Sequence, residues 1–391
     1  MPATRRFRMG GAAAALTCLL AMGSFAAPVW ADDDDAAAEK PRSYPYVKGE
    51  LSVEVEYDHI DINGAPDIND TYTTTELEIG TYFSPFFSVH GHFTFEPVFD
   101  AEPGDDRFFE DHGLYAEELY AKFSFKPFDV KAGKYNPAFG SAFDETPGIY
   151  GTDLAEDYEL TERVGLAIST EREGTPFGKV TLTASTFFAD TSFLSDSAFT
   201  RRGRTDREDG GLSNTENLDS FAFSIEGEDI PGFTGLKYNI GFVHQAAGID
   251  DLDDQNGFVF GLKQTRSFNN VELQVIGETA YFDYGGNLYD ADDDEEFVDS
   301  LWYWTLGAQL TFNEKYRINT AYTARNAELL DGTNFDDFQW TASGGMKVWR
   351  EWWLEAGYKY LEEADEESHT VGLKLSKTFG FDTSSLEPAM K

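Results

Sequence analysis

Hydrophobic and polar residues alternate one by one along most of the chain after residue 45. In residues 46–58, for example, Val, Leu and Tyr occupy the odd positions, while Glu, Lys and Asp occupy most of the even ones. A period of two places the two sets of side chains on opposite faces of a β-strand. The pattern therefore predicts strands rather than helices.

The alternation recurs in sixteen segments, most of them about the 9 to 11 residues that a tilted membrane-spanning strand requires. The predicted strands are residues 46–58, 71–83, 86–96, 114–125, 128–135, 163–171, 179–189, 219–228, 236–247, 257–266, 270–283, 301–312, 316–326, 337–348, 353–361 and 369–381. No window after the first thirty residues approaches the run of about 20 apolar residues in a spanning helix. We therefore predict an all-β protein, a transmembrane antiparallel up-and-down barrel over residues 46–381.

The connections between these strands alternate without exception between short and long. The short ones are residues 84–85, 126–127, 172–178, 229–235, 267–269, 313–315 and 349–352. The others are residues 59–70, 97–113, 136–162, 190–218, 248–256, 284–300, 327–336 and 362–368. This alternation is typical of bacterial outer-membrane barrels, which have short periplasmic turns and longer external loops.

Aromatic residues support a barrel in lipid over a large soluble β-protein. Trp302, Trp304 and Phe312 share one face of a predicted strand, with the tryptophans at one end, as in the aromatic girdles of membrane barrels. A soluble protein would need a second, consistently buried face. A barrel of sixteen strands instead encloses water, so its inward positions should be polar.

The two ends of the chain lie outside the predicted barrel. Residues 1–31 have the basic start, apolar run and small-residue end of a signal peptide. Residues 32–45 form a flexible periplasmic leader, and residues 382–391 form a C-terminal tail. The only cysteine, Cys18, lies in the signal peptide, so the exported chain has neither disulfides nor a cysteine nucleophile.

The chain is strongly acidic. The first 31 residues contain three arginines and no acidic residue, so their removal leaves 27 basic against 71 acidic residues, a formal charge of −44. Such a polyanion repels nucleic acid. The acidic residues gather in residues 100–111, 250–254, 290–299 and 362–367, from which we expect external loops that meet lipopolysaccharide through divalent cations.

The connection 136–162 is long, polar and rich in Gly and Pro, and connections of this length in compact proteins are usually functional or disordered. We expect this long third external loop to fold into the lumen and narrow a pore, rather than to form an external lid. Its candidate constriction residues are Asp144, Glu145, Asp153, Glu156 and Asp157.

Odd and even positions of a strand lie on opposite faces, so the position of each charged residue predicts whether it faces the lumen. The charges predicted to face inward are unevenly distributed. The candidate pore-lining acids of the first strands are Glu54, Glu76 and Glu118. The candidate bases of the later strands are Lys131, Arg163, Arg317, Arg325, Lys347 and Lys374. Opposed charges across a narrow channel set ion preference, although each single charge is also explained by the need to keep the lumen wet.

The histidines give little support for a metal site or for catalysis. His90, His92 and Glu96 share a strand face, but two ligands on one strand rarely hold a metal without a third. Residues 290–296 lack the glycine and spaced glutamate of a calcium loop. His59, His112, His244 and His369 occur in no catalytic motif. We therefore expect no metal, no cofactor and no enzymatic activity.

One stretch resembles a known family. The run Gly133-Lys-Tyr-Asn-Pro-Ala-Phe-Gly140, the preceding Glu117-Glu-Leu-Tyr120 and the later Thr161-Glu-Arg163 are similar to features of LbtU-type siderophore porins and, more distantly, of phosphate-selective porins. The likeness covers residues 114–171, and Ala138 is an insertion relative to the family's turn. It implies a sixteen-stranded, passive outer-membrane channel, as a homotrimer or a monomer.

The expected function is passive diffusion of small hydrophilic solutes across the outer membrane of a Gram-negative bacterium, with iron-siderophore chelates as the specialisation that the resemblance implies. The alternative is a structural or adhesive barrel with acidic, cation-binding external loops and no open pore.

Overall fold

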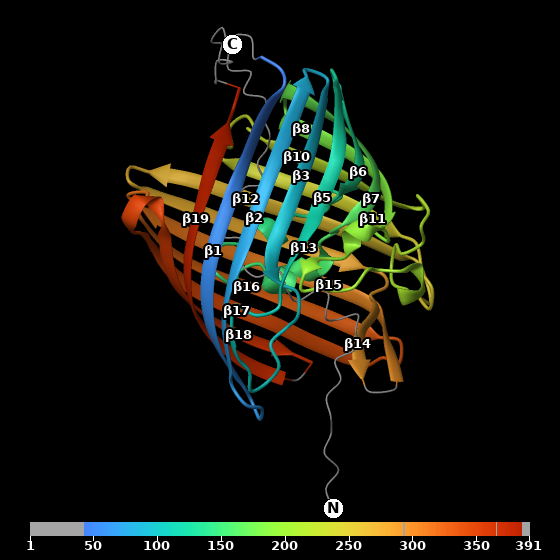
Figure 1. Cartoon of the computed structure of the whole chain (residues 1–391), viewed down its shortest axis with the longest axis vertical. Helices are drawn as coiled ribbons and strands as arrows, with labels where there is room; N and C mark the ends of the chain where they lie inside the picture. Colours follow the sequence, from blue (N-terminus) through green and yellow to red (C-terminus); the bar gives the residue numbers. More distant parts are fainter. Residues whose placement is uncertain (1–42, 292–293, 365, 385–391) are drawn as a thin grey trace, which may run out of the picture.

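The computed structural model describes residues 43–291, 294–364 and 366–384, which form one closed antiparallel β-barrel (Figure 1). The predicted signal peptide, most of the predicted leader and most of the predicted tail lie outside the described residues. In the described part of the chain, no helix is long and apolar enough to cross a membrane.

Sixteen strands form the barrel wall, as the alternation predicts. They are β1 (Tyr46–Ile62), β2 (Ile68–Ser84), β3 (Phe87–Pro97), β5 (His112–Phe125), β6 (Phe128–Tyr135), β7 (Arg163–Thr175), β8 (Gly178–Ala189), β10 (Ser220–Glu228), β11 (Leu236–Gln245), β12 (Gln255–Phe268), β13 (Val271–Phe282), β15 (Asp294–Phe312), β16 (Tyr316–Leu329), β17 (Asn334–Lys347), β18 (Trp353–Glu363) and β19 (Glu366–Asp382). Each pairs with its neighbours in the chain, and β1 pairs with β19 from Lys48–Asp382 to Ile62–Ser368. This last pairing closes the barrel, so the wall has no free edge.

The connections contain short elements of their own. The three short strands are β4 (Asp106–Phe108), which runs parallel to β2, β9 (Ala198–Phe199), which pairs with β5, and β14 (Gly286–Ala291), which pairs with β15. The helices are α1 (Ala142–Glu145), η1 (Asp153–Tyr158), η2 (Phe193–Ser195), η3 (Arg207–Asp209) and η4 (Trp349–Glu351).

The two faces of the wall differ as predicted. In β15, Trp302 and Trp304 are 42% and 50% exposed, whereas Tyr303 and Thr305 between and beside them are 2% and 1% exposed. The strands that the structure describes form one sheet closed on itself, so among them no second sheet packs against the exposed apolar face, as a two-sheet sandwich would require. The exposed apolar face is the one that lipid would cover.

Three of the predicted long loops are much shorter than expected. Strand β1 extends to Ile62 and β2 begins at Ile68, and only residues 330–333 lie between β16 and β17. Strand β18 continues to Glu363 and β19 begins at Glu366. Residues 59–70, 327–336 and 362–368 were predicted as loops because they are polar. A hairpin that extends above the membrane has both faces in water, so its side chains can all be polar. It still forms strands, because hydrogen bonds between the two strands pair their peptide groups.

The inward face is not uniformly polar, contrary to the prediction. Ala222, Val243, Val259, Ala280 and Phe282 have the inward parity and are 3% exposed or less. They lie on neighbouring strands from β10 to β13. An apolar inner surface of this kind needs a partner, and the segment between β6 and β7 provides it.

Candidate functional site

The connection 136–162, here called the inner segment, packs against the apolar inward face. Its Phe139, Phe143, Tyr158 and Leu160 belong to the same buried cluster as residues of β8, β10–β13, β15 and β16. The segment is not regular, since it contains only one turn of α1 and the short helix η1. Burial of aromatic rings therefore fixes its position more than secondary structure does.

Glu278 of β13 holds the start of the inner segment. Its carboxylate accepts hydrogen bonds from the backbone N–H groups of Ser141 and Ala142, both at 2.9 Å, and from the Tyr158 hydroxyl at 2.7 Å. Gly140 has a φ of +81°, and a Cβ there would come within 2.9 Å of Glu278 Oε1. The close approach therefore requires glycine at this position.

Three ion pairs fasten the segment to other strands. Glu145 contacts Lys263 of β12 at 3.0 Å, Asp153 contacts Lys359 of β18 at 2.6 Å, and Asp157 contacts Arg325 of β16 at 2.7 Å. The Tyr150 hydroxyl also donates to Asp58 of β1. Figure 1 shows the strands of the wall around these short green helices. The inner segment therefore has bonds to separate arcs of the wall.

Arg325 forms ion pairs with three carboxylates. Besides Asp157, it contacts Asp337 of β17 at 2.6 Å and Glu363 of β18 at 2.7 Å, and its side chain is 2% exposed. A buried guanidinium is stable only when carboxylates compensate its charge. Arg325 thus joins the inner segment and three strands in one network.

The structure brings some of the other predicted site residues together. Glu54 and Lys374 form an ion pair at 3.2 Å, and Arg317 pairs with Glu355. Glu156 accepts a hydrogen bond from Thr152 of its own segment, 2.6 Å away. The charges of the two ion pairs are therefore neutralised inside the wall.

The remaining predicted site residues have weaker or separate contacts. Lys131 lies over the Tyr120 ring at 4.7 Å, Arg163 donates to Gln245 at 3.4 Å, and Lys347 pairs with Glu351 in the turn after β17. Glu118 accepts the Asn136 N–H at 2.9 Å. Asp144 and Glu76 are half-buried. Lys347 therefore belongs to the rim of the barrel.

Sequence reasoning missed several anchors of the inner segment. Glu278, Lys263 and Lys359 have the inward parity, but nothing in the sequence ranks them above other inward charges. Lys134 was quoted only within the run 133–140 that carries the family resemblance, and not as a site residue. It is 2% exposed and pairs with Glu162 at 2.6 Å and Asp190 at 2.9 Å. Their partners are more than twenty residues away in the chain, so only the fold reveals them.

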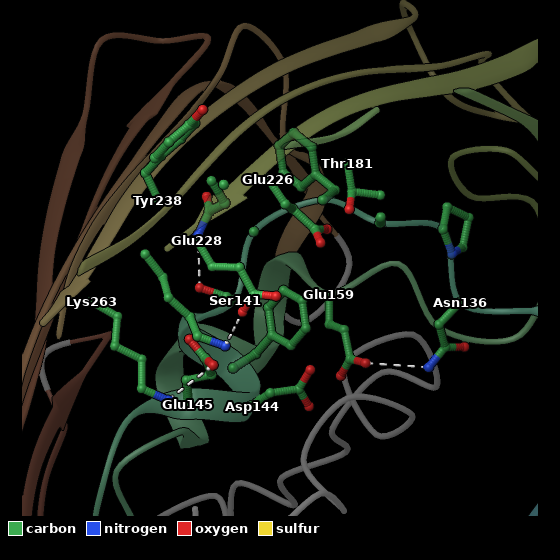
Figure 2. Close-up of a pocket in the computed structure, with 18 of the residues that line it drawn as sticks. Asn136, Ser141, Asp144, Glu145, Glu159, Thr181, Glu226, Glu228, Tyr238 and Lys263 are labelled. Atoms are coloured by element: carbon green, nitrogen blue, oxygen red, sulfur yellow. Dashed lines mark hydrogen bonds and ion pairs between the residues drawn. The ribbon is translucent and has the colours of Figure 1, made fainter. Parts of the chain in front are cut away.

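A cavity of about 520 Å³ lies beside the inner segment (Figure 2), within the usual range for small-molecule sites. Glu171, Lys179, Glu228 and Lys237 of its lining flank the short turns after β7 and β10. The cavity therefore faces the short-turn end of the barrel. Its carboxylates are Glu78, Glu117, Glu118, Asp144, Glu145, Glu159, Glu171, Glu226 and Glu228, and its lysines are Lys131, Lys179, Lys237 and Lys263.

Several carboxyl groups of the inner segment hold their protons more tightly than usual. Burial, followed by the nearby charges of Glu117 and Glu145, raises the pKa of Asp144 to about 7. Burial raises the pKa of Asp157 to about 6, although Arg325 lowers it. Burial and the charge of Asp144 raise the pKa of Glu159 well above its ordinary value. Asp144 and Asp157 therefore change charge near neutral pH.

The histidines once considered for a metal have other contacts. His90 bonds Ser88 at 2.9 Å and stacks on Tyr120, while His92 Nδ1 lies 3.4 Å from Glu117. Glu96 accepts a hydrogen bond from Tyr115. Among the residues that the structure describes, no three His, Cys, Asp or Glu side chains are grouped so as to hold a metal ion.

Known proteins resemble this chain in structure alone. No protein-family model and no curated protein sequence matches it. OccK9 (OpdG) of Pseudomonas aeruginosa is 10% identical and covers 86% of this chain and 98% of its own, with a TM-score of 0.52. The outer membrane protein OpdK of the same organism is also 10% identical, with a TM-score of 0.52. The match covers 86% of this chain and 99% of OpdK. A loop-deletion mutant of OmpT, an outer membrane protein of Vibrio cholerae, is 10% identical, with a TM-score of 0.50. The match covers 85% of this chain and 99% of the mutant.

At such low identity the likeness establishes the fold, which is that of a sixteen-stranded outer-membrane porin. The more specific resemblance to LbtU-type siderophore porins finds no support in these matches.

Proposed function

We propose that this barrel forms a water-filled channel in the outer membrane of a Gram-negative bacterium, through which small hydrophilic solutes diffuse passively. The observation that carries the proposal is the closed sixteen-stranded wall, whose apolar side chains face outward and whose charged side chains face inward. A wall of this size leaves an aqueous interior. Diffusion through it needs no catalytic group and no cofactor.

We further propose that the inner segment lies in the lumen and forms the constriction. Its bonds to Asp58, Lys263, Glu278, Arg325 and Lys359 reach the inward faces of five strands. A segment fixed at so many points narrows the pore without moving. The remaining passage runs past the cavity, whose lining comes from the segment and from strands between β2 and β12.

The solute class is a separate question. OpdK has been solved with vanillate and OccK2 (OpdF) of Pseudomonas aeruginosa with glucuronate, both of which are carboxylates. In this chain the inward cations Arg317, Arg325, Lys359 and Lys374 are already paired with carboxylates. They are poorly placed to attract a free anion. Permeation of ferric siderophore chelates stays a prediction, which liposome swelling with such chelates would test against sugars, amino acids and phosphate.

The acidic loops suggest how the barrel would meet its surroundings. Asp250, Asp251, Asp253 and Asp254 follow β11 on the long-loop side. We propose that they meet lipopolysaccharide through divalent cations. A monomer and a homotrimer are both compatible with the outward face.

Reconstitution tests the channel directly. The folded mature chain, added to a planar lipid bilayer in KCl, should produce discrete current steps, because ions cross the water that fills the barrel. Its folded state is checked by the altered gel mobility of an unheated sample. A silent bilayer that contains inserted, folded protein would instead support the structural or adhesive alternative.

The channel's preference for K⁺ over Cl⁻ should fall when the pH is lowered from about 8 to about 5. Asp144, whose pKa is raised to about 7, and Asp157, whose pKa is raised to about 6, are ionised above these values and neutral below them. The charged groups around Asp144 are Glu78 of β2, His92 of β3, Glu117 of β5, and Glu145 and Glu159 of the segment.

The measurement is the reversal potential across a KCl gradient at each pH. In the Asp144→Asn variant, the part of the change centred near pH 7 should disappear. A preference that is independent of pH in the native channel would contradict this assignment.

A further inference from the structure

We propose that the short-turn end of β15 to β19 binds an anionic phospholipid of the periplasmic leaflet of the outer membrane. The surface, here called the basic rim, consists of the turn after β15, the turn after β17 and part of β19: residues 313–315, 347–352 and 377–379. These residues include four basic ones, Lys315, Lys347, Arg350 and Lys377, and two acidic ones, Glu314 and Glu351. The inference goes beyond the channel and does not depend on whether the barrel conducts.

Hydrogen bonds join the three parts of the basic rim. The Lys347 N–H donates to the Lys315 carbonyl oxygen at 2.8 Å, which connects the first two turns. The Lys377 ammonium donates to the Arg350 carbonyl oxygen at 2.5 Å, which connects the second turn to β19. The second turn contains η4, the orange coil at the left of Figure 1. The basic side chains therefore belong to neighbouring turns at one side of the barrel end.

Three cations of the basic rim have no carboxylate partner. Lys347 pairs with Glu351 at 2.9 Å, whereas Lys315, Arg350 and Lys377 form no ion pair with any residue that the structure describes. The whole chain has 71 acidic and 30 basic residues, so most of its surface repels an anionic membrane. The basic rim is net positive and therefore attracts anionic headgroups locally.

Each of the three cations lies over an aromatic ring. The distances from the cation to the ring centroid are 4.4 Å for Arg350 and Trp349, 4.8 Å for Lys377 and Phe379, and 5.3 Å for Lys315 and Tyr316. Such a contact covers one side of the cation and leaves N–H groups that can donate to a phosphate. Trp and Tyr are also the residues that gather at headgroup level. The positive charges therefore lie where the phosphate of a lipid would be.

The turn that carries Arg350 gives a second, independent indication of a ligand. The Trp352 N–H donates to the Trp349 carbonyl oxygen at 3.2 Å, and the two residues between them, Arg350 and Glu351, have φ of +51° and +67°. Hairpin turns with two positive φ angles favour Asn and Gly, because other L residues rarely adopt this conformation. Arginine is a poor choice for the backbone of this turn, which points to a role for its side chain.

The outward face next to the basic rim suits the acyl chains of the same lipid. Tyr316, Ile318, Met346 and Phe379 are exposed, and Met346 is the cross-strand partner of Tyr316. A bound lipid would lay its chains on these side chains and its phosphate against the cations. A zwitterionic lipid offers the same chains without a net negative charge. The charge of the headgroup should therefore decide which lipid is bound.

The test is native mass spectrometry of the folded full mature chain in detergent, titrated with phosphatidylglycerol or with phosphatidylcholine that has the same acyl chains. Phosphatidylglycerol should half-saturate the protein at a concentration about tenfold or more below that of phosphatidylcholine. In the combined Lys315→Gln, Arg350→Gln and Lys377→Gln variant, this preference should fall to about twofold or less, because all three unpaired cations are lost. An excess of inorganic phosphate should not displace the lipid, because phosphate has no chains to bury.

The matched control removes three exposed cations at or near the other short turns: Lys126→Gln, Arg172→Gln and Arg266→Gln. Both variants then have the same net charge, and the control should keep the native preference within about twofold. Equal half-saturation by the two lipids, equal losses in the two variants, or displacement by inorganic phosphate would overturn the lipid site. The altered gel mobility of unheated samples shows whether each variant folds. If the triple variant of the basic rim does not fold, the two lipids and the phosphate competition on the native chain decide alone.

Discussion

Deleting residues 142–159 and joining the ends with a short Gly/Ser linker should raise the single-channel conductance by about twofold or more, since a sixteen-stranded wall without a constriction leaves a wide aqueous pore. The deletion removes α1, η1 and the carboxylates Glu145, Asp153 and Asp157. The preference for cations should weaken at the same time, because the negative charge moves away from the ion path. Conductance and reversal potential in a KCl gradient measure both effects.

A matched deletion of residues 250–253 provides the control, because it also shortens a connection and removes three aspartates, but it lies outside the inner segment. This control should conduct like the native channel. If deletion of 142–159 leaves the conductance unchanged, the constriction lies elsewhere in the barrel.

Replacing Arg325 by Met should lower the free energy of unfolding by about 3–5 kcal/mol, the range expected when one partner of a buried charge network is removed. Asp337 is 3% exposed and Asp157 is mostly covered, so their carboxylates would lose a cation that water cannot replace. Urea unfolding of the barrel in detergent, followed by tryptophan fluorescence, measures the change.

Arg266→Met is the control, because Arg266 is exposed near the end of β12, and it should change stability by less than about 0.5 kcal/mol. Adding Asp337→Asn to Arg325→Met should restore part of the loss, since one uncompensated charge disappears. A loss below about 1 kcal/mol for Arg325→Met would mean that water reaches the network.

The sequence was sufficient to predict the wall because a membrane barrel has two solvents. Each strand must carry apolar side chains toward lipid and can carry polar ones inward, so the alternation is explicit in strands such as β15 with Trp302 and Trp304. The strand count follows from it. The alternation of short and long connections holds only in part, because extended strands replace three of the predicted long loops. The side-chain alternation did not predict where the strands end, because β1 continues to Ile62 and β2 begins at Ile68 as a polar hairpin.

The interior was harder to predict, because parity gives the face of a residue but neither its height in the barrel nor its partner. It placed Arg325 and Lys374 inside, but could not pair them with Asp157 and Glu54. The inward apolar residues were the one missed signal. Val243, Val259 and Ala280 belong to an apolar stripe on the inward face, and an apolar stripe inside a water-filled barrel indicates that a segment covers it.

The seam between the first and last strands makes the wall depend on the whole chain. Val47 and Thr383 are hydrogen-bonded across 336 positions of sequence, and the 17 residues of β19 supply one full side of the seam. A polypeptide that stopped before β19 would leave two rows of unpaired peptide groups in hydrocarbon, each group costing several kcal/mol. Truncation there would not yield a slightly smaller cylinder, but a curled sheet without a stable place in the bilayer.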